Sequence, residues 1–225
     1  MLPVLAGLAA GMIHVLAGPD HLAAVAPLAA EAGPRAWRTG LRWGLGHALG
    51  ALAVGALVLL FRRVIPLELV AGHGERLVGL ALVGIGLWAL RRALSGRLHA
   101  HEHEHDGHRH THLHIHLRGG AGSHSHPAAH AHEHAALVIG VLHGVAGSSH
   151  LVGVLPALAL PSLAASVVYL SGFAMGTVAG MLTFAALAGL IAERLVAAAG
   201  DRAYGILLGG LAAVAGGVGA FWLLG

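Results

Sequence analysis

The sequence contains no cysteine and no lysine, and it has few charged residues of any kind. Without cysteine the chain holds neither disulfides nor thiolate-bound metal, and thiol–disulfide electron transfer is excluded. Charged residues make up 10% of the 225 residues, whereas an ordinary soluble protein has about 25%. So few charges cannot cover a soluble surface, and the 56% of hydrophobic residues indicates an integral membrane protein.

All 13 basic residues are arginine, and they stand at the ends of apolar segments instead of forming one basic stripe. The calculated pI of about 10.5 therefore reflects membrane topology, and no nucleic-acid partner is expected.

Six apolar segments are long enough to cross roughly 30 Å of hydrocarbon, which needs about 20 helical residues. We predict an all-α integral membrane protein with spans at 2–30, 39–61, 76–96, 135–160, 163–192 and 203–224. Ala17-Gly18-Pro19 interrupts the first span and Ala146-Gly147-Ser148-Ser149 the fourth, so both helices should be broken there. The first segment lacks a basic n-region, and we interpret it as a span and not as a cleaved signal.

A polar pattern occurs twice in the chain. From His14 to His21 the sequence reads His, two residues, Ala-Gly, two residues, His, and the segment from His143 to His150 repeats it. About one span later each half has an aromatic residue followed by a Gly-xxx-Gly pair: Trp43, Gly46 and Gly50, then Phe173, Gly176 and Gly180. Three spans per half reverse the direction of the second half, so the sequence predicts two inverted three-helix repeats. The chain then divides into a first repeat at 1–96, a His-rich loop at 97–134 and a second repeat at 135–225.

The arginines orient the predicted spans. Three lie on one side, Arg62, Arg63 and Arg76, and ten lie in or beside the loops after the odd-numbered spans: Arg35, Arg38, Arg42, Arg91, Arg92, Arg97, Arg109, Arg118, Arg194 and Arg202. Because loops rich in arginine stay in the cytoplasm, we expect the His-rich loop to be cytoplasmic and both termini to lie outside.

The loop at 97–134 holds 14 of the 20 histidines. We expect a metal-collecting role for those at alternate positions: His101, His103, His105, His108, His110, His112, His114 and His116. The loop has too few apolar residues to hold a fixed fold, so it should be disordered without metal. A solvated spacer that is merely rich in histidine is the alternative interpretation.

His14, Asp20 and His21 place metal-competent side chains inside an apolar span. On a continuous helix the two histidines would share one face, and the break would bring them and Asp20 closer together. Imidazole and carboxylate ligands suit Ni(II), Co(II), Zn(II) or Fe(II), and an aspartate in a span costs about 2.5–3.5 kcal/mol, which favours a functional role. His47, His143 and His150 would complete the site, although the last two are equally typical of interhelical hydrogen bonding.

Asp20-His21 preceded by His14, with Leu45-Gly46-His47 in the second span, resembles the nickel/cobalt transporter family. The run from Gly18 to Val25 is most similar to the urease-accessory-type branch, and the His-rich loop resembles that of the nickel/cobalt efflux relatives. The resemblance implies that His14, Asp20, His21 and His47 form the metal-selecting path. This chain has one more residue between His14 and Asp20 than the family's signature, and fewer spans than the long uptake permeases.

These features favour a secondary transporter, not an enzyme, which moves Ni2+ or Co2+ as substrate and holds no cofactor. We expect it in the inner (cytoplasmic) membrane of a prokaryote, surrounded by lipid, with a second copy of the chain or a separate metal chaperone as further partners. No Walker A pattern occurs, so an ion gradient, the membrane potential or a partner must supply the energy.

Two other functions stay open. One is export of a small organic or sulfur-containing anion, in which Arg38 or Arg42 would contact the substrate. The other is a membrane-embedded metallohydrolase, because a metal-bound water at a His/Asp cluster can hydrolyse amide or ester bonds. The absence of a His-Glu-x-x-His pattern counts against the hydrolase.

Overall fold

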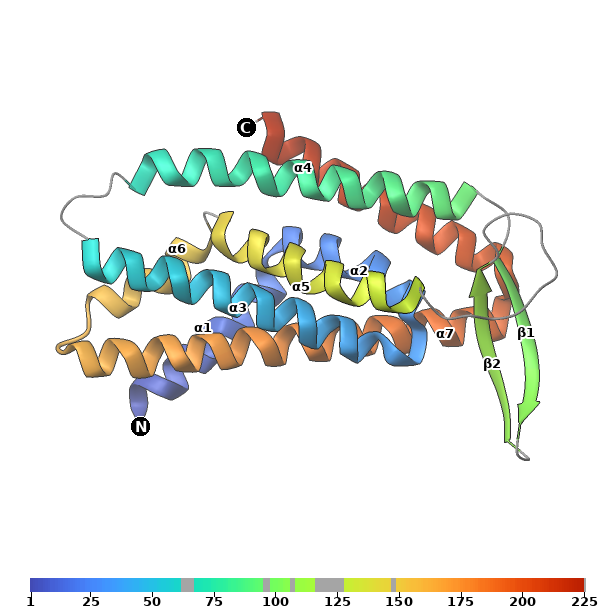
Figure 1. Cartoon of the computed structure of the whole chain (residues 1–225), viewed down its shortest axis with the longest axis horizontal. Helices are drawn as coiled ribbons and strands as arrows, with labels where there is room; N and C mark the ends of the chain where they lie inside the picture. Colours follow the sequence, from blue (N-terminus) through green and yellow to red (C-terminus); the bar gives the residue numbers. More distant parts are fainter. Residues whose placement is uncertain (62–66, 95–97, 106–107, 116–127, 147–148, 225) are drawn as a thin grey trace.

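The computed structural model describes the backbone of all residues except 62–66, 95–97, 106–107, 116–127, 147–148 and 225. Side chains are described for 1–57, 75–94, 136–146, 153–200 and 202–224. The described residues form an elongated bundle of helices with a two-stranded hairpin at one end (Figure 1).

The first half of the chain contributes four α-helices and a short 3-10 turn. Their bounds are α1 Leu2–Ala17, α2 Pro19–Ala32, η1 Gly33–Arg35, α3 Ala36–Phe61 and α4 Leu67–Leu94. The hairpin strands β1 (Leu98–His105) and β2 (His108–Ile115) follow, and the second half contributes α5 Ala128–Ala146, α6 Ser149–Leu158 and α7 Leu163–Leu224.

The predicted break in the first helix is confirmed. α1 ends at Ala17, Gly18 has an extended backbone (φ −82°, ψ 104°), and α2 begins at Pro19. Proline suits this position because the first residue of a helix has no intrahelical use for its N–H. Residues 2–17 and 19–57 meet there at a bend of 71°. In the second half α5 ends at Ala146 and α6 begins at Ser149, where the second break was expected, but residues 147–148 lie outside the described part.

α7 runs for 62 residues with one non-helical residue inside it. Gly200 has φ 73° and ψ −175°, a backbone conformation that residues with a side chain rarely adopt. The two parts of α7 on either side of Gly200 correspond to the fifth and sixth predicted spans.

Three helices are long and apolar enough to cross a membrane: Glu75–Leu94, Leu163–Gly200 and Arg202–Leu224. The bent pair of 2–17 with 19–57 makes a fourth if it counts as one span. The apolar helix Ala136–Ala146, within α5, is shorter than a span. By these criteria the described residues contain three to four candidate spans, and the chain is a helical membrane protein.

The hairpin corrects one expectation. β1 and β2 pair antiparallel, with His99, His101, His103 and His105 opposite His114, His112, His110 and His108. The expectation that this segment has no fixed fold is wrong for the backbone of the two strands. Ladder hydrogen bonds need no apolar core, and alternating residues around an Asp-Gly pair are the sequence pattern of a two-residue hairpin. α5 also begins at 128, before the expected start of the span at 135.

Glycines let two pairs of helices touch backbone to backbone. Where α1 meets α7, a Cβ atom on Gly11 or Gly176 would lie 2.1 Å from a carbonyl oxygen of the facing helix. Where α3 meets α5, a Cβ atom on Gly46 or Gly144 would lie 2.2 Å from such an oxygen. We call these two contacts the glycine seams. Gly46 and Gly176, the first glycines of the two repeated Gly-xxx-Gly pairs, thus allow two backbones to approach closely, and in each seam the partner helix comes from the other half of the chain.

Three apolar clusters form the core, and each contains at least one large buried aromatic residue. Trp43 belongs to the central cluster, with Val15, Val25 and Met181. Phe173 belongs to a second cluster with residues of α6, and Tyr204 to a third between α4 and the two parts of α7. The predicted polar residues on α1, α2, α3 and α5 therefore lie inside a well-packed bundle.

Candidate metal site

Four predicted ligands from the first half meet in the middle of the bundle. His14 comes from α1, Asp20 and His21 from the start of α2, and His47 from α3. The ring centroids of His14 and His21 are 4.5 Å apart, those of His21 and His47 are 4.8 Å apart, and those of His14 and His47 are 5.6 Å apart. Asp20, His21 and His47 are buried and His14 is partly buried.

His143 of α5 joins this group from the second half. Its ring centroid lies 4.7 Å from that of His21 and 5.6 Å from that of His47. The histidine that the repeated pattern singled out in the second half thus lies beside those of the first half. The side chain of His150 lies outside the described residues, as do the side chains of the eight histidines assigned to metal collection.

Asp20 holds two imidazoles, one from each half. Its Oδ1 is 3.0 Å from Nδ1 of His21 and its Oδ2 is 3.1 Å from Nε2 of His143. In each bond the ring N–H donates and the carboxylate oxygen accepts. Asp20 is 1% exposed, so these two hydrogen bonds replace those that its carboxylate would otherwise make to water. The sequence predicts Asp20 as a site residue, but nothing in it indicates this bridge between the halves.

The five residues form two overlapping groups of metal-competent side chains. One group is His14, His21 and His47, and the other is Asp20, His21 and His143. Within each group the ligand atoms lie within 4.8 Å of one another. Imidazole nitrogens with one carboxylate suit borderline divalent ions such as Ni(II), Co(II) and Zn(II). His21 belongs to both groups.

Two buried aromatic rings pack against the imidazoles across the halves. The Phe173 ring centroid on α7 lies 5.4 Å from that of His14, and the Trp43 ring centroid on α3 lies 6.1 Å from that of His143. Each ring belongs to one half and each imidazole to the other.

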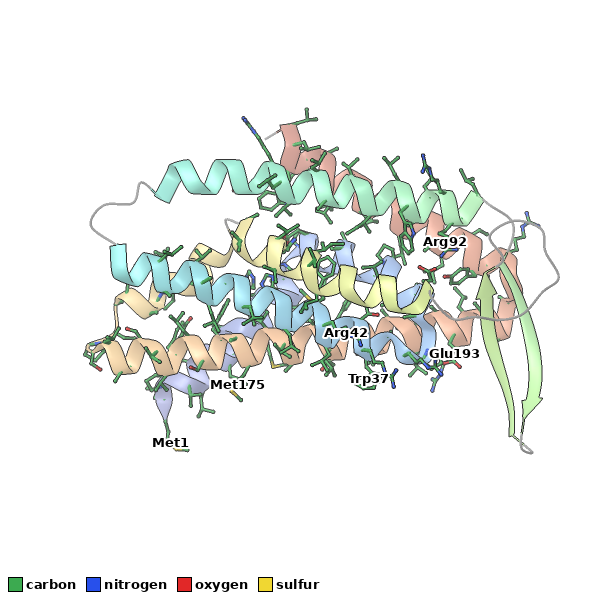
Figure 2. The ribbon with its side chains drawn as sticks, in the orientation of Figure 1. Met1, Trp37, Arg42, Arg92, Met175 and Glu193 are labelled. Carbon is green, nitrogen blue, oxygen red and sulfur yellow. The ribbon has the colours of Figure 1, made fainter. Side chains whose placement is uncertain are left out.

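A second polar cluster, which sequence reasoning missed, lies at the far end of α2. Nη2 of Arg92 on α4 donates to Oε1 of Glu31 at 2.5 Å, and the Arg92 guanidinium lies 5.7 Å from the Trp88 ring centroid. Tyr204 is buried beside this pair, and its hydroxyl has no hydrogen-bond partner among the described residues. Figure 2 shows Arg92 toward the hairpin end of the bundle, the end at which Trp37 and Glu193 also lie.

The arginines of the anion alternative are on α3. Arg38 lies over the ring of Trp37, with its Cζ 5.4 Å from the ring centroid, and Trp37 is 42% exposed. This contact places Arg38 at the surface of the bundle.

Comparison with known proteins gives three relatives. FOR GROWTH AND FERTILITY 1 and 2, chloroplast proteins of Arabidopsis thaliana, are 34% and 33% identical over 190 residues. The alignments cover 84% of this chain but 50% and 47% of theirs, so the chain spans about half the length of these relatives. Urease accessory protein UreH of Bacillus sp. (strain TB-90) is 31% identical over 187 residues, which are 82% of this chain and 75% of UreH. No family model and no solved structure matches the chain.

Apolar helices around a buried His–Asp cluster define a membrane protein with a polar centre. The match to UreH extends over most of both chains and is sufficient to assign a family. The chain belongs to the family of the urease accessory protein UreH.

Proposed function

We propose that the chain is a secondary transporter for Ni2+ or Co2+, built from six spans arranged as two inverted three-helix repeats. The observation that carries the proposal is the gathering of Asp20 and four imidazoles from both halves, all buried except the partly buried His14, in the middle of an apolar bundle. Ionisable residues inside a membrane are costly, and they mark substrate or ion pathways.

The inverted repeat is supported by contacts that are exchanged between the halves. Phe173 of the second half packs on His14 of the first, and Trp43 of the first half packs on His143 of the second. The glycine seams show the same exchange, since α3 packs on α5 and α7 on α1. A pseudo-twofold axis between two interlocked repeats produces paired contacts of this kind, with a substrate site where the repeats meet.

Two observations support Ni2+ or Co2+ as the substrate: the types of ligand in the site and the relationship to UreH. Nitrogen-rich sites favour borderline ions over Mg2+ or Ca2+. The relative UreH is named as a urease accessory protein, and the run from Gly18 to Val25 resembles the urease-accessory-type branch of the nickel/cobalt transporters. Because histidines must lose protons to bind a metal, proton exchange at the site would couple transport to a proton gradient.

The proposed orientation puts the hairpin end in the cytoplasm of a prokaryotic cell. Arg92 lies toward that end (Figure 2), as the excess of cytoplasmic arginine requires. The hairpin register sets histidine opposite histidine at four positions, which supports a role in collecting metal.

The first experiment measures nickel and cobalt by elemental mass spectrometry in metal-challenged cells that express the chain or its His21→Ala variant. Metal content below that of the empty-vector control, restored by the variant, means export. Content above the control, abolished by the variant, means uptake. Content equal to the control for both metals would contradict the proposal.

Deletion of 99–134 tests the collecting role of the loop. We expect the metal concentration that gives half-maximal flux to shift while flux at saturating metal persists, because the buried histidines remain in place. The measurement is initial flux against metal concentration in vesicles, and complete loss of flux would contradict a collecting role.

A further inference from the structure

His21 belongs to both groups of metal-competent residues, and its imidazole can give one ion only one of its two ring nitrogens. We infer that the ion is held by His14, His21 and His47, while Asp20 and His143 are positioning residues that act through His21. This division of roles rests on the proposed function and goes beyond it.

The Nδ1 edge of His21 is already occupied by protein atoms. Oδ1 of Asp20 lies 3.0 Å from Nδ1. The Gly18 backbone also closes this edge, because a Cβ atom on Gly18 would lie 2.2 Å from Nδ1 of His21 and 2.9 Å from Oδ1 of Asp20. An ion with its remaining water has no room there. Since an imidazole has two nitrogens, the ion must use Nε2 of His21.

The imidazoles of His14, His21 and His47 are arranged so that they can converge on one ion. The rings of His14 and His47 meet the His21 ring edge to face, with interplanar angles of 79° and 72°. Their ligand atoms lie within 4.8 Å of one another, so small side-chain movements bring three nitrogens onto one ion. A site with three protein ligands keeps further positions open for water, as catalytic zinc sites do. An ion that must enter and leave needs such exchangeable positions.

The Asp20 carboxylate supports His21 and connects it to the second half of the chain. Both oxygens of Asp20 accept from imidazoles, Oδ1 from His21 and Oδ2 from His143. A carboxylate that accepts the N–H of a metal-binding histidine fixes its tautomer and ring orientation and raises its basicity. Asp20 lies on α2 and His143 on α5. A displacement of one half against the other therefore moves the support of His21, which links ion binding to the relative position of the halves.

His47→Gln and His143→Gln make a matched pair that tests the assignment. Both residues are buried, both lose an imidazole, and their ring centroids lie 4.8 and 4.7 Å from that of His21. The full-length chain in detergent is titrated with Co2+, and binding is read from the visible d–d absorption. The His21→Ala chain is subtracted each time, which cancels binding by the His-rich loop. We expect His143→Gln to retain the buried site and His47→Gln to lose it.

Asp20→Asn tests the role of the carboxylate. The amide keeps the shape and still accepts one N–H, so the Co2+ band should keep its position while affinity falls about 10- to 100-fold, as for other residues that support a metal ligand. Glu31→Gln is the control, because it removes a carboxylate from the same helix without touching an imidazole, and it should leave affinity unchanged.

The outcomes separate this inference from the proposed function. Loss of the site in His143→Gln, alone or together with His47→Gln, would overturn the inference, and so would a shifted Co2+ band in Asp20→Asn. Equal Co2+ binding by the wild-type and His21→Ala chains would overturn the proposed function itself. If Asp20→Asn fails to elute as a folded protein in size-exclusion chromatography, the matched pair still decides.

Discussion

Two carboxylates lie near opposite ends of α2, and their partners differ. Asp20 contacts imidazoles at the start of the helix, and Glu31 contacts the guanidinium of Arg92 at its end, about 16 Å away by the rise of an α-helix. An imidazole exchanges its proton or binds a metal near neutral pH, whereas a guanidinium keeps its charge and offers only donors. The Asp20 cluster is therefore suited to exchanging protons or metal ions, and the Glu31–Arg92 pair to a permanent structural contact.

The two clusters also differ in their burial and in how closely helices approach around them. The imidazole cluster sits at the Gly18 break and between the glycine seams, where helices are interrupted or closely approached. The Glu31–Arg92 pair lies where α2 ends, next to the 3-10 turn at Gly33–Arg35, and each of its side chains is 16% exposed. α2 thus carries the metal-competent Asp20 cluster at its start, and the Glu31–Arg92 ion pair holds its other end to α4. We call this ion pair the anchor.

Gly18→Ala should break the imidazole cluster and have the largest effect. The added methyl group would overlap Nδ1 of His21, so His21 and Asp20 must move, and we expect metal-dependent flux to fall to the empty-vector level. The measurement is cellular nickel and cobalt content. Gly84→Ala on α4 is the control, because nothing lies within 4 Å of its added Cβ, and it should behave as wild type.

Arg92→Ala should break the anchor and leave the imidazole cluster intact. It leaves a largely buried carboxylate on Glu31 without this donor, which costs about 1–3 kcal/mol of folding free energy. The measurement is denaturant unfolding in mixed micelles, with Co2+ affinity followed in parallel. Arg91→Ala removes an exposed arginine next to it and should change stability little. Equal loss in the two variants would mean that the pair does not anchor α2.

Tyr204→Phe sharpens the comparison and should have the smallest effect. The Tyr204 hydroxyl is buried and has no hydrogen-bond partner among the described residues. Its removal therefore breaks no hydrogen bond there and removes the free-energy cost of burying a polar group. Unfolding free energy should stay within about 0.5 kcal/mol of wild type or rise. A clear loss of stability in the same unfolding assay would show that the hydroxyl is bonded in the membrane.

Much of the site could be predicted because its signals are local. Gly18-Pro19 marks the helix break, Asp20-His21 places charge in an apolar segment, and the repeated pattern indicated His143. The Asp-Gly pair between alternating histidines is likewise typical of a hairpin, although the lack of apolar residues there favours a segment with no fixed fold. These signals need only neighbouring residues.

The remainder depends on packing between distant helices. Glu31 and Arg92 are 61 residues apart, and Arg92 looked like one more arginine at the end of a span. Likewise, nothing in the sequence shows that the two oxygens of Asp20 serve different halves. Such contacts form only once the helices cross at defined positions. Here the helices cross closely where glycine, which has no side chain, lets two backbones touch.

The glycine seams also affect how variation among relatives should be interpreted. A seam glycine such as Gly11 or Gly144 touches backbone, so any larger residue pushes two helices apart regardless of its chemistry. Selection should therefore preserve these glycines as strictly as the imidazoles, although they bind no ion. A search for ligands among invariant positions would find both, and only the chemistry of the side chain would tell the packing positions from the metal-binding ones.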